Sequence, residues 1–353
     1  MKKIFRLFAL LLLLALLLCA CGEKVKLYEI NGENAWFSYP VESAPVKAVN
    51  AGERWYLLKG HYSGDSFTLA VGADYAAADD VYAASGVGIW FFEANDALAA
   101  WCEETAENMR FMVYNAESGK TAEVFTVSKA EGFAPANVGV WGKNVYFANV
   151  DYKTESAAIM CYNAETGALS KLAPLEYRGE YSCTSLSVDG GVLLASVGTA
   201  REAELIKADL LGGALTHIPL EDEVSVAYAC AYDRTEGGYA VYYRDVDGAE
   251  HIGTVNAKNG KIKKIFTFGE NVYAYLDTIE LFGGHLYWVQ QTNASGKVAD
   301  HYRFVDYDLS YDTADEYVRT FAFALAQDGV TLLSYNAADF DAIYLTEIYL
   351  GGQ

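Results

Sequence analysis

The chain has 353 residues, of which 52% are hydrophobic and only five are proline, so it can build a large core and is unlike a disordered chain. Its formal net charge is −21, and a surface of that sign repels nucleic acid and anionic lipid headgroups. We therefore expect no nucleic-acid partner, and an acidic coat that keeps the protein in solution explains the charge without a specific acidic recognition face.

Residues 1–20 have the features of a signal peptide. Basic residues at positions 2, 3 and 6 precede an uncharged run of 14 residues, Leu7 to Ala20, whereas a membrane span needs roughly 20. The end of this run, Leu18-Cys19-Ala20-Cys21-Gly22, resembles the lipobox of bacterial lipoproteins. The resemblance implies that Cys21 is acylated and holds the protein at the bacterial cell envelope, outside the cytoplasm. An ordinary signal peptide with incidental cysteines is the alternative.

Residues 21–34 are expected to form a short tether. In the chain that follows, a turn motif recurs. In each copy an Asn or Asp stands four residues before a Gly, as in Tyr162 to Gly167, which has the sequence YNAETG. Asn and Asp side chains bond their own backbone, and Gly supplies positive φ, so the motif predicts a hairpin turn. The Asn or Asp residues of successive copies are 48, 46 and 47 residues apart: Asn115, Asn163, Asp209 and Asn256. This regular spacing indicates a repeat protein.

A second motif, a Gly-containing turn before an aromatic or aliphatic stretch, occurs seven times. Comparable positions are Tyr56, Trp90, Tyr146, Leu193, Ala240, Tyr287 and Thr331. The gaps between them are 34, 56, 47, 47, 47 and 44 residues, which suggests an insertion in the second unit. Short strands separated by tight turns predict an all-β fold, and a unit of about 45 residues has room for the four strands of a β-propeller blade.

We therefore predict one seven-bladed β-propeller over residues 35–353. The predicted blades are Val41–Asp80, Val81–Ser128, Lys129–Pro174, Leu175–Leu220, Glu221–Gly269, Glu270–Val318 and Arg319 onward. The last unit has room for only three strands. The alternating stretch Ala35 to Tyr39 is expected to supply its fourth strand and so close the ring, which removes an exposed sheet edge.

The apparent insertion in the second unit predicts a short amphipathic helix. From Asn95 to Met109, apolar residues recur at helical spacing, with Asn95 or Asp96 as the N-cap. The helix is expected to pack on its own blade, and a role in partner binding is the alternative.

The repeats resemble those of bacterial propeller lipoproteins and, loosely, TolB-like propellers. The YNAETG and VNAKNG stretches are similar to the Asp-Ala-x-Thr-Gly-Lys segment of quinoprotein-type propellers. Those families have a Trp four residues after the Gly, where this chain has Glu123, Lys171 and Lys264. The resemblance thus implies a propeller fold and no quinone cofactor.

No catalytic or metal-binding motif is present. The chain has no HExxH, GxSxG or Walker sequence, and its five histidines lack metal-ligand spacing. Beyond Cys21 the cysteines are spaced by 59, 22 and 47 residues, which fits no zinc site: Cys102, Cys161, Cys183 and Cys230. We expect buried free thiols, although the compartment would also permit a disulfide.

The two sets of connections in each blade differ in composition. Connections between the first and second strands, and between the third and fourth, are tight and define a tight-turn face. The remaining connections are longer and richer in aromatic and charged residues, and they define a long-loop face. Because function concentrates on such loops, the candidate ligand-binding residues are Trp101, Tyr152, Tyr177, Arg178, Arg201, Arg244 and Tyr275. Packing of the tyrosines between blades is the alternative.

The sequence thus favours a membrane-anchored, extracytoplasmic binding protein whose long-loop face takes a carbohydrate, peptide or protein partner. A propeller-type glycosidase or lyase is the alternative, and it would need carboxylates or a metal converging in the central funnel. A scaffold in envelope assembly is a third hypothesis, by analogy alone. If the stretch from Ala35 runs from the tight-turn face to the long-loop face, a lipid on Cys21 would hold the tight turns toward the membrane.

Overall fold

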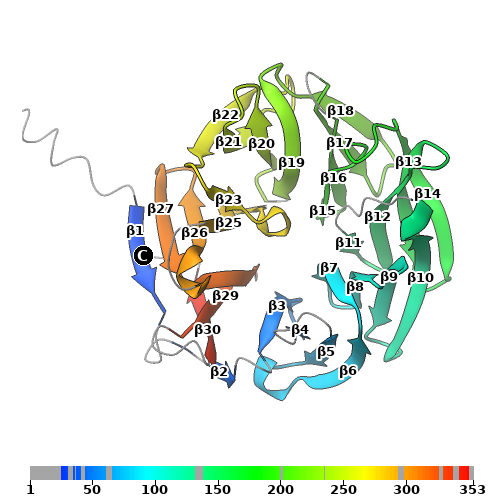
Figure 1. Ribbon diagram of the computed structural model, residues 1–353, viewed down its shortest axis with the longest axis vertical. Coiled ribbons are helices and arrows are strands. Elements are labelled where there is room, and N and C mark those ends of the chain that lie inside the picture. The colour runs from blue at the N-terminus through cyan, green and yellow to red at the C-terminus, as the bar shows by residue number, and fades with distance from the viewer. Residues whose placement is uncertain are drawn as a thin grey trace, which may run out of the picture.

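Seven small sheets stand in a ring around a central axis (Figure 1). The computed structural model describes residues 25–30, 35, 37–40, 44–60, 66–131, 138–198, 202–233, 235–292, 298–325, 329–336 and 342–349. The expected signal peptide and Cys21 lie outside these residues. Within them the regular structure is strand with a few short 3-10 turns, and no helix is long and apolar enough to cross a membrane.

Blades 1 to 4 follow one another along the chain, each with its first strand innermost. Blade 1 contains β3 (Pro45–Asn50), β4 (Trp55–Gly60), β5 (Ser66–Gly72) and β6 (Asp79–Ser85). Blade 2 contains β7 (Gly88–Ala94), β8 (Leu98–Glu104), β9 (Asn108–Asn115) and β10 (Lys120–Ser128). Blade 3 contains β11 (Val138–Trp141), β12 (Asn144–Asp151), β13 (Ser156–Asn163) and β14 (Ala168–Leu175). Blade 4 contains β15 (Ser185–Asp189), β16 (Val192–Val197), β17 (Glu204–Asp209) and β18 (Leu215–Pro219).

The last three blades complete the ring, and two of them include strands from the N-terminal region. Blade 5 contains β19 (Val224–Asp233), β20 (Gly238–Asp245), β21 (Glu250–Val255) and β22 (Ile262–Thr267). Blade 6 contains β23 (Val272–Ala274), β24 (Glu280–Phe282), β25 (His285–Thr292), β26 (Tyr302–Asp308), β27 (Thr313–Val318) and β1 (Val25–Glu29). Blade 7 contains β28 (Thr320–Leu325), β29 (Gly329–Tyr335), β30 (Ala342–Tyr349) and β2 (Phe37–Pro40).

The predicted seven-bladed propeller is confirmed, and so is its closure by an N-terminal strand. β2 pairs antiparallel with β30, with Tyr39 opposite Ile343, and supplies the fourth strand of blade 7. The repeated turn motif also behaves as predicted. The Asn163 side chain accepts hydrogen bonds from the backbone N–H groups of Glu165 and Thr166, and Gly167 has a φ of +70°.

The helix predicted from Asn95 to Met109 is wrong, because this stretch forms most of the β8–β9 hairpin. All of β8 is buried except its last residue, so both faces of the strand carry apolar side chains and no alternation marks it as a strand. The position equivalent to Tyr56 is then Ala100, 44 residues after it and 46 before Tyr146, and blade 2 has no insertion. The first blade boundary lies after Ser85, not at Asp80.

β1 is a strand that the sequence did not predict, and it occupies part of the expected tether. It pairs in parallel with β27, from Val25 opposite Ala314 to Glu29 opposite Val318. The Tyr28 ring stacks on Tyr317 at 4.9 Å. β1 is only five residues long and all of them are exposed, so its apolar residues form no buried face of the kind from which strands are recognised.

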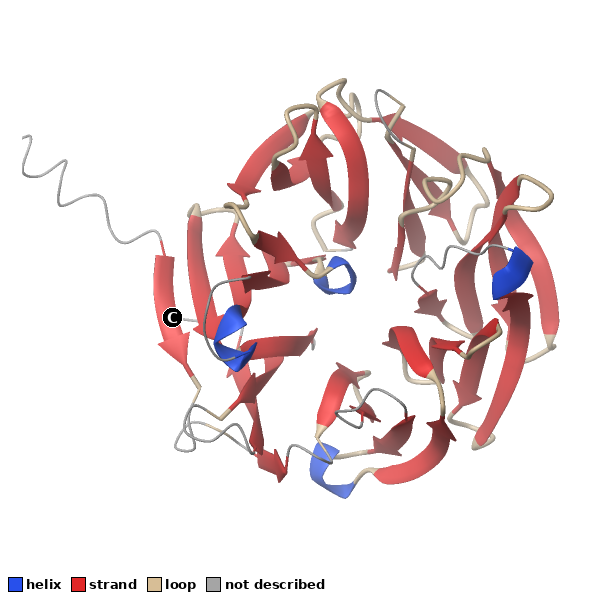
Figure 2. Ribbon diagram, in the orientation of Figure 1, coloured by secondary structure: helices blue, strands red, loops and turns tan. Residues whose placement is uncertain are grey.

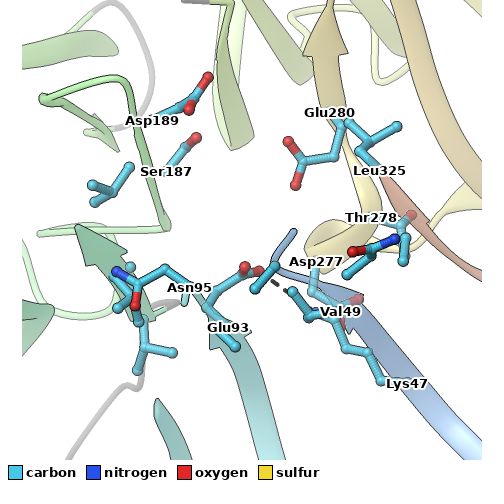
Figure 3. A pocket seen from close by; sticks show the side chains of 18 of the residues that line it. Lys47, Val49, Glu93, Asn95, Ser187, Asp189, Asp277, Thr278, Glu280 and Leu325 are labelled. Atoms are coloured by element: carbon cyan, nitrogen blue, oxygen red, sulfur yellow. Dashed lines mark ion pairs between the residues drawn. The ribbon is translucent and has the colours of Figure 1, made fainter. Parts of the chain in front are cut away.

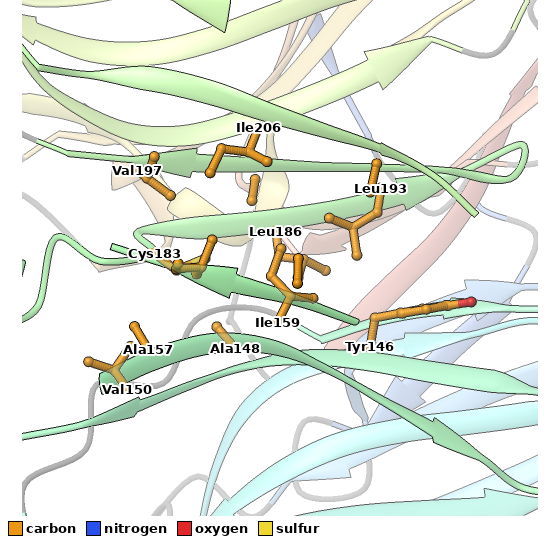
Figure 4. Close-up of a cluster of buried hydrophobic side chains, with 14 residues drawn as sticks. Tyr146, Ala148, Val150, Ala157, Ile159, Cys183, Leu186, Leu193, Val197 and Ile206 are labelled. Carbon is orange, nitrogen blue, oxygen red and sulfur yellow. The ribbon is translucent and has the colours of Figure 1, made fainter. Parts of the chain in front are cut away.

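The hydrophobic core lies between neighbouring blades and is divided into clusters around the ring. In the cluster between blades 3 and 4, Ile159 packs with Leu186 and Leu193 (Figure 4). The cysteines are free thiols as expected: Cys102, Cys183 and Cys230 are buried, and Cys161 is half-buried. Because every blade contributes to two such interfaces, the ring holds its innermost strands in fixed positions around the axis.

Candidate functional site

Trp101, a predicted ligand contact, is a core residue. Its side chain is fully buried in β8, and its indole N–H donates a 2.9 Å hydrogen bond to Glu103. The buried Glu103 carboxylate also accepts hydrogen bonds from Tyr82 and Arg110. Trp101 therefore positions a buried carboxylate within blade 2 and offers no surface to a ligand.

Three predicted residues come together on the long-loop face of blades 3 and 4. The rings of Tyr152 and Tyr177 meet edge to face at 6.2 Å. Beside them, Arg178 donates to the Glu202 carbonyl at 2.9 Å and to the Glu176 carboxylate at 2.7 Å. These contacts bind the loops to one another.

The other predicted residues do not join this group. Arg244, on blade 5, lies over the Tyr228 ring at 5.2 Å and pairs with Glu250 at 3.1 Å. Tyr275, on blade 6, donates to the Gln291 side chain and stacks on Tyr302 at 5.9 Å. Arg201 lies outside the described residues. The predicted set is thus spread around the ring, and it forms no single site.

The channel on the ring axis is a more concentrated site. A cavity of about 1020 Å³ is lined by the innermost strands of most blades and by several of their tight turns, including those at Gly52, Asn95, Gly142 and Gly190. Figure 3 shows charged and polar side chains from different blades pointing into this space. Its volume matches the upper range of ligand pockets.

Blade 6 narrows the channel because its innermost strand is broken. β23 pairs with one end of β25 and β24 with the other, and the 3-10 turn η4 (Leu276–Thr278) spans the gap. η4 lies near the middle of the ring in Figure 2. η4 extends into the channel and places Asp277 near Lys47, which lies on β3 of blade 1.

Lys47 stands between two carboxylates from different blades. Its ammonium Nζ is 3.7 Å from Glu93 of β7 and 3.6 Å from Asp277 of η4. These distances are too long for hydrogen bonds, and among the described residues Nζ has no hydrogen-bond partner although it is buried. The Glu93 and Asp277 side chains retain 30% and 35% exposure, so both carboxylates reach the open channel.

The electrostatics of the cluster favour a neutral Glu280 beside a charged Lys47. Burial raises the pKa of Glu280 to about 8, and the neighbouring Glu93 adds to the shift while Lys47 opposes it. Burial also raises the pKa of Glu93. Burial disfavours the Lys47 ammonium, but Asp277 and Glu93 outweigh this effect and raise its pKa. In Figure 3, the Glu280 carboxyl points into the space opposite Ser187 and Asp189.

This arrangement combines hydrogen-bond donors and acceptors in a confined space. A protonated Glu280 can donate, the other carboxylates accept, and the Lys47 ammonium has donors to spare. Tyr275 and Phe321 also line the cavity. Among the described residues, no group of three or more His, Cys, Asp or Glu side chains is placed to hold a metal ion.

Sequence reasoning missed the charged cluster of the channel, which consists of Lys47, Glu93, Asp277 and Glu280. A signal did exist, because each lies within or beside an apolar stretch that ends in a tight turn, where a lone charge is unexpected. Lys47, Glu93 and the Asp277–Glu280 pair are far apart in the chain, and their convergence follows only from the ring.

Comparison with protein-family models and with curated proteins finds no match. Solved structures do match. The β-propeller domain of the trilobed protease from Pyrococcus furiosus is similar at a TM-score of 0.56 and 9% identity, over 89% of this chain and 97% of that chain. An oligogalacturonate lyase from Vibrio parahaemolyticus is similar at a TM-score of 0.54 and 11% identity, over 87% and 92%.

TolB from Acinetobacter baumannii matches at a TM-score of 0.44 and 11% identity, over 69% of this chain and 61% of that chain. The first two structures, with TM-scores above 0.5, show that the chain shares the propeller fold, and at these identities they show nothing about activity.

Proposed function

We propose that this chain is a lipid-anchored, extracytoplasmic binding protein that takes an uncharged carbohydrate in its central channel. The observation that carries the proposal is the convergence of Lys47, Glu93, Asp277 and Glu280 on one cavity of about 1020 Å³. Sugar hydroxyls both donate and accept hydrogen bonds, which this mixed set of groups can satisfy, and the aromatic residues that line the cavity can cover the apolar faces of a sugar.

The charge of the wall supports an uncharged ligand over an acidic one. The lining has five carboxyl groups, those of Glu93, Asp96, Asp189, Asp277 and Glu280, and two ammonium groups, those of Lys47 and Lys143, so acidic charge is in excess even with Glu280 protonated. An oligogalacturonate, the substrate class in the name of the similar lyase, is polyanionic and would be repelled here.

A channel ligand is also better supported than a peptide or protein on the long-loop face. The predicted contact residues there already have partners within the protein: Arg178 bonds Glu176 and Glu202, and Arg244 pairs with Glu250. A ligand on that face would have to replace these contacts, whereas Lys47 Nζ has hydrogen-bonding capacity left.

Calorimetric titration with neutral oligosaccharides, uronate oligosaccharides and a basic peptide tests the ligand class. We expect only the neutral sugars to bind, and Asp277→Asn and Lys47→Met to weaken binding about tenfold, or ~1.4 kcal/mol. Glu117→Gln, at an exposed turn, is the matched control. Binding of the basic peptide alone would refute the carbohydrate assignment. If Arg178→Ala loses binding and the channel variants keep it, the binding site lies on the long-loop face instead.

The anchor rests on the lipobox resemblance at Cys21 and has its own test. Metabolic labelling with a fatty-acid analogue should mark the wild type and leave Cys21→Ala unmarked. Equal labelling of both proteins would refute the anchor.

Glycoside hydrolysis in the same channel is a second candidate, favoured by Glu280. A carboxyl group with a pKa of about 8 stays protonated at neutral pH, as a general acid must, and the Glu93 and Asp277 carboxylates lie in the same cavity. Release of new reducing ends, lost in Glu280→Gln while binding persists, would establish the enzyme. Saturable binding without product would exclude it.

A further inference from the structure

We propose that the outer edge of blade 6 is a membrane-contact surface, seated on a bilayer of zwitterionic lipids beside the anchor. This inference rests on the proposed acylation of Cys21. The surface, called here the edge patch, consists of β1 and the turn that joins β26 to β27. Its large apolar side chains are exposed to 45%, 62%, 39% and 80%, respectively: Val25, Leu27, Tyr28 and Tyr311. Large apolar side chains exposed together along one edge and its adjoining turn mark an interaction surface more often than scattered single residues do.

The strand register places Val25 and Leu27 on one face of β1 and Tyr28 on the other, all along the free edge of the blade, with Tyr311 close to the start of the strand. Val25 lies opposite Ala314, near the start of β27, and Tyr311 lies in the turn just before that strand. This turn joins the third and fourth strands of blade 6, so the patch reaches the tight-turn face. Figure 1 shows β1 on the outer edge of the ring beyond β27, where none of the described strands covers it.

The length of chain before β1 brings the patch to the lipid. Val25 follows Cys21 by four residues, a reach of at most ~14 Å even when fully extended. An acylated Cys21 has its chains in the bilayer, so the start of β1 cannot leave the interfacial region. Tyrosine and aliphatic side chains are favoured at that depth.

β1 is fixed to the propeller, so the contact would set the pose of the whole molecule. The strand pairs with β27 over its whole length, and Tyr28 stacks on Tyr317. At its far end, Glu29 pairs with Arg319 at 2.6 Å, and Arg319 also holds Asp300 at 2.7 Å. Motion about a flexible tether is therefore not available beyond Val25.

The charges around the patch select the kind of bilayer. Asp308, Asp312 and Asp315 lie in or beside the same turn and strand, and Lys26 is the basic residue of β1. Carboxylates of this density oppose anionic headgroups, so the contact should form on zwitterionic lipid and weaken as anionic lipid is added.

The test compares tryptophans at two matched positions in the full-length protein. Tyr311 and Leu211 are both 80% exposed in tight turns, but Leu211 lies between β17 and β18 of blade 4, away from the anchor. The variants Tyr311→Trp and Leu211→Trp are reconstituted in phosphatidylcholine vesicles with and without nitroxide-labelled lipid. The fluorescence of the added tryptophan is obtained by subtracting the signal of the unsubstituted protein, and its quenching by the nitroxide is measured. We expect roughly twofold quenching at position 311 and little at position 211.

Each outcome decides the matter. Quenching at position 311 alone, weakened by anionic lipid and lost in Cys21→Ala, supports the edge contact. Equal quenching at both positions, or none at either in membranes whose protein carries the fatty-acid label, overturns the contact and leaves the anchor standing. Absence of the label at Cys21 overturns both. Cross-linking between copies through position 27 that rises with protein concentration would assign the patch to a second copy instead.

Discussion

Glu280→Gln should make the protein more stable at alkaline pH, because it removes an ionisable group that folding places in an unfavourable environment. In the folded protein burial raises the pKa of Glu280 from 4.5 to about 8. Between these values the unfolded chain releases a proton that the folded protein retains, so the free energy of unfolding falls as pH rises through that window. Glutamine has no such proton and escapes the loss.

The size of the effect follows from the pKa shift and the position of the side chain. At about 1.4 kcal/mol for each unit, the shift sets a ceiling of ~5 kcal/mol. Because the carboxyl lines an open channel, water screens part of this energy, and we expect about 2 kcal/mol at pH 8.5. For a chain of this length that corresponds to a rise in Tm of about 3 °C.

Urea unfolding at pH 4.5, 6.5 and 8.5 measures the effect directly. The stability difference between Glu280→Gln and the wild type should be near zero at pH 4.5 and should grow toward pH 8.5. The control Glu117→Gln, whose side chain is 81% exposed, should show no such trend. A difference that stays constant with pH, or a variant less stable at pH 8.5, would refute the account of the channel. A gain in stability together with weaker ligand binding would mark Glu280 as a functional residue.

Three further predictions concern the fold. Glu103→Gln removes the charge from a fully buried carboxylate with three side-chain donors and should cost about 3–5 kcal/mol in urea unfolding; a loss below ~1 kcal/mol would contradict this. The hydrogen bond to Asp306 raises the pKa of His285, so its stabilisation is present at low pH and lost as pH rises through the folded value. His285→Asn should therefore cost more stability at pH 5.5 than at pH 9, and equal costs would refute the pairing. Truncation through Tyr39 should cost several kcal/mol or cause aggregation, and truncation through Glu29 much less, as judged by melting temperature and light scattering.

The fold could be predicted from the sequence because turn chemistry repeats along it. Asn115 and Asn163 each stand four residues before a Gly. Each closes a hairpin of the same kind, in blades 2 and 3 respectively, because its side chain accepts hydrogen bonds from the backbone N–H groups that follow it. The spacing of these turns gave the size of the blade, and the shortage of strands in the last unit pointed to closure by the stretch from Ala35. These features are local, so they are visible in a single sequence.

The errors arose where a strand lacks the alternation that local reasoning requires. β8 is apolar on both faces, and so Trp101 was assigned to a helix and then to a binding face. β1 is short and exposed along its whole length, so its apolar residues form no buried face that would mark it as a strand. In both cases the neighbouring strand decides the structure, and a single sequence does not reveal which strand that is.

The channel site was missed for a reason that lies in the architecture. The middle strands of each blade pair on both edges and pack on both faces, so their sequences are tightly constrained and produce the periodicity. The innermost strand pairs on one edge only, and its other edge faces the channel. It can therefore be interrupted, as η4 interrupts it in blade 6, at small cost to the ring. Charged residues such as Lys47 and Glu93 can be placed there for the same reason. A propeller can therefore evolve a binding site on its innermost strands, where its repeats are least regular. Periodicity in the sequence does not reveal such a site, because the residues that form it do not repeat.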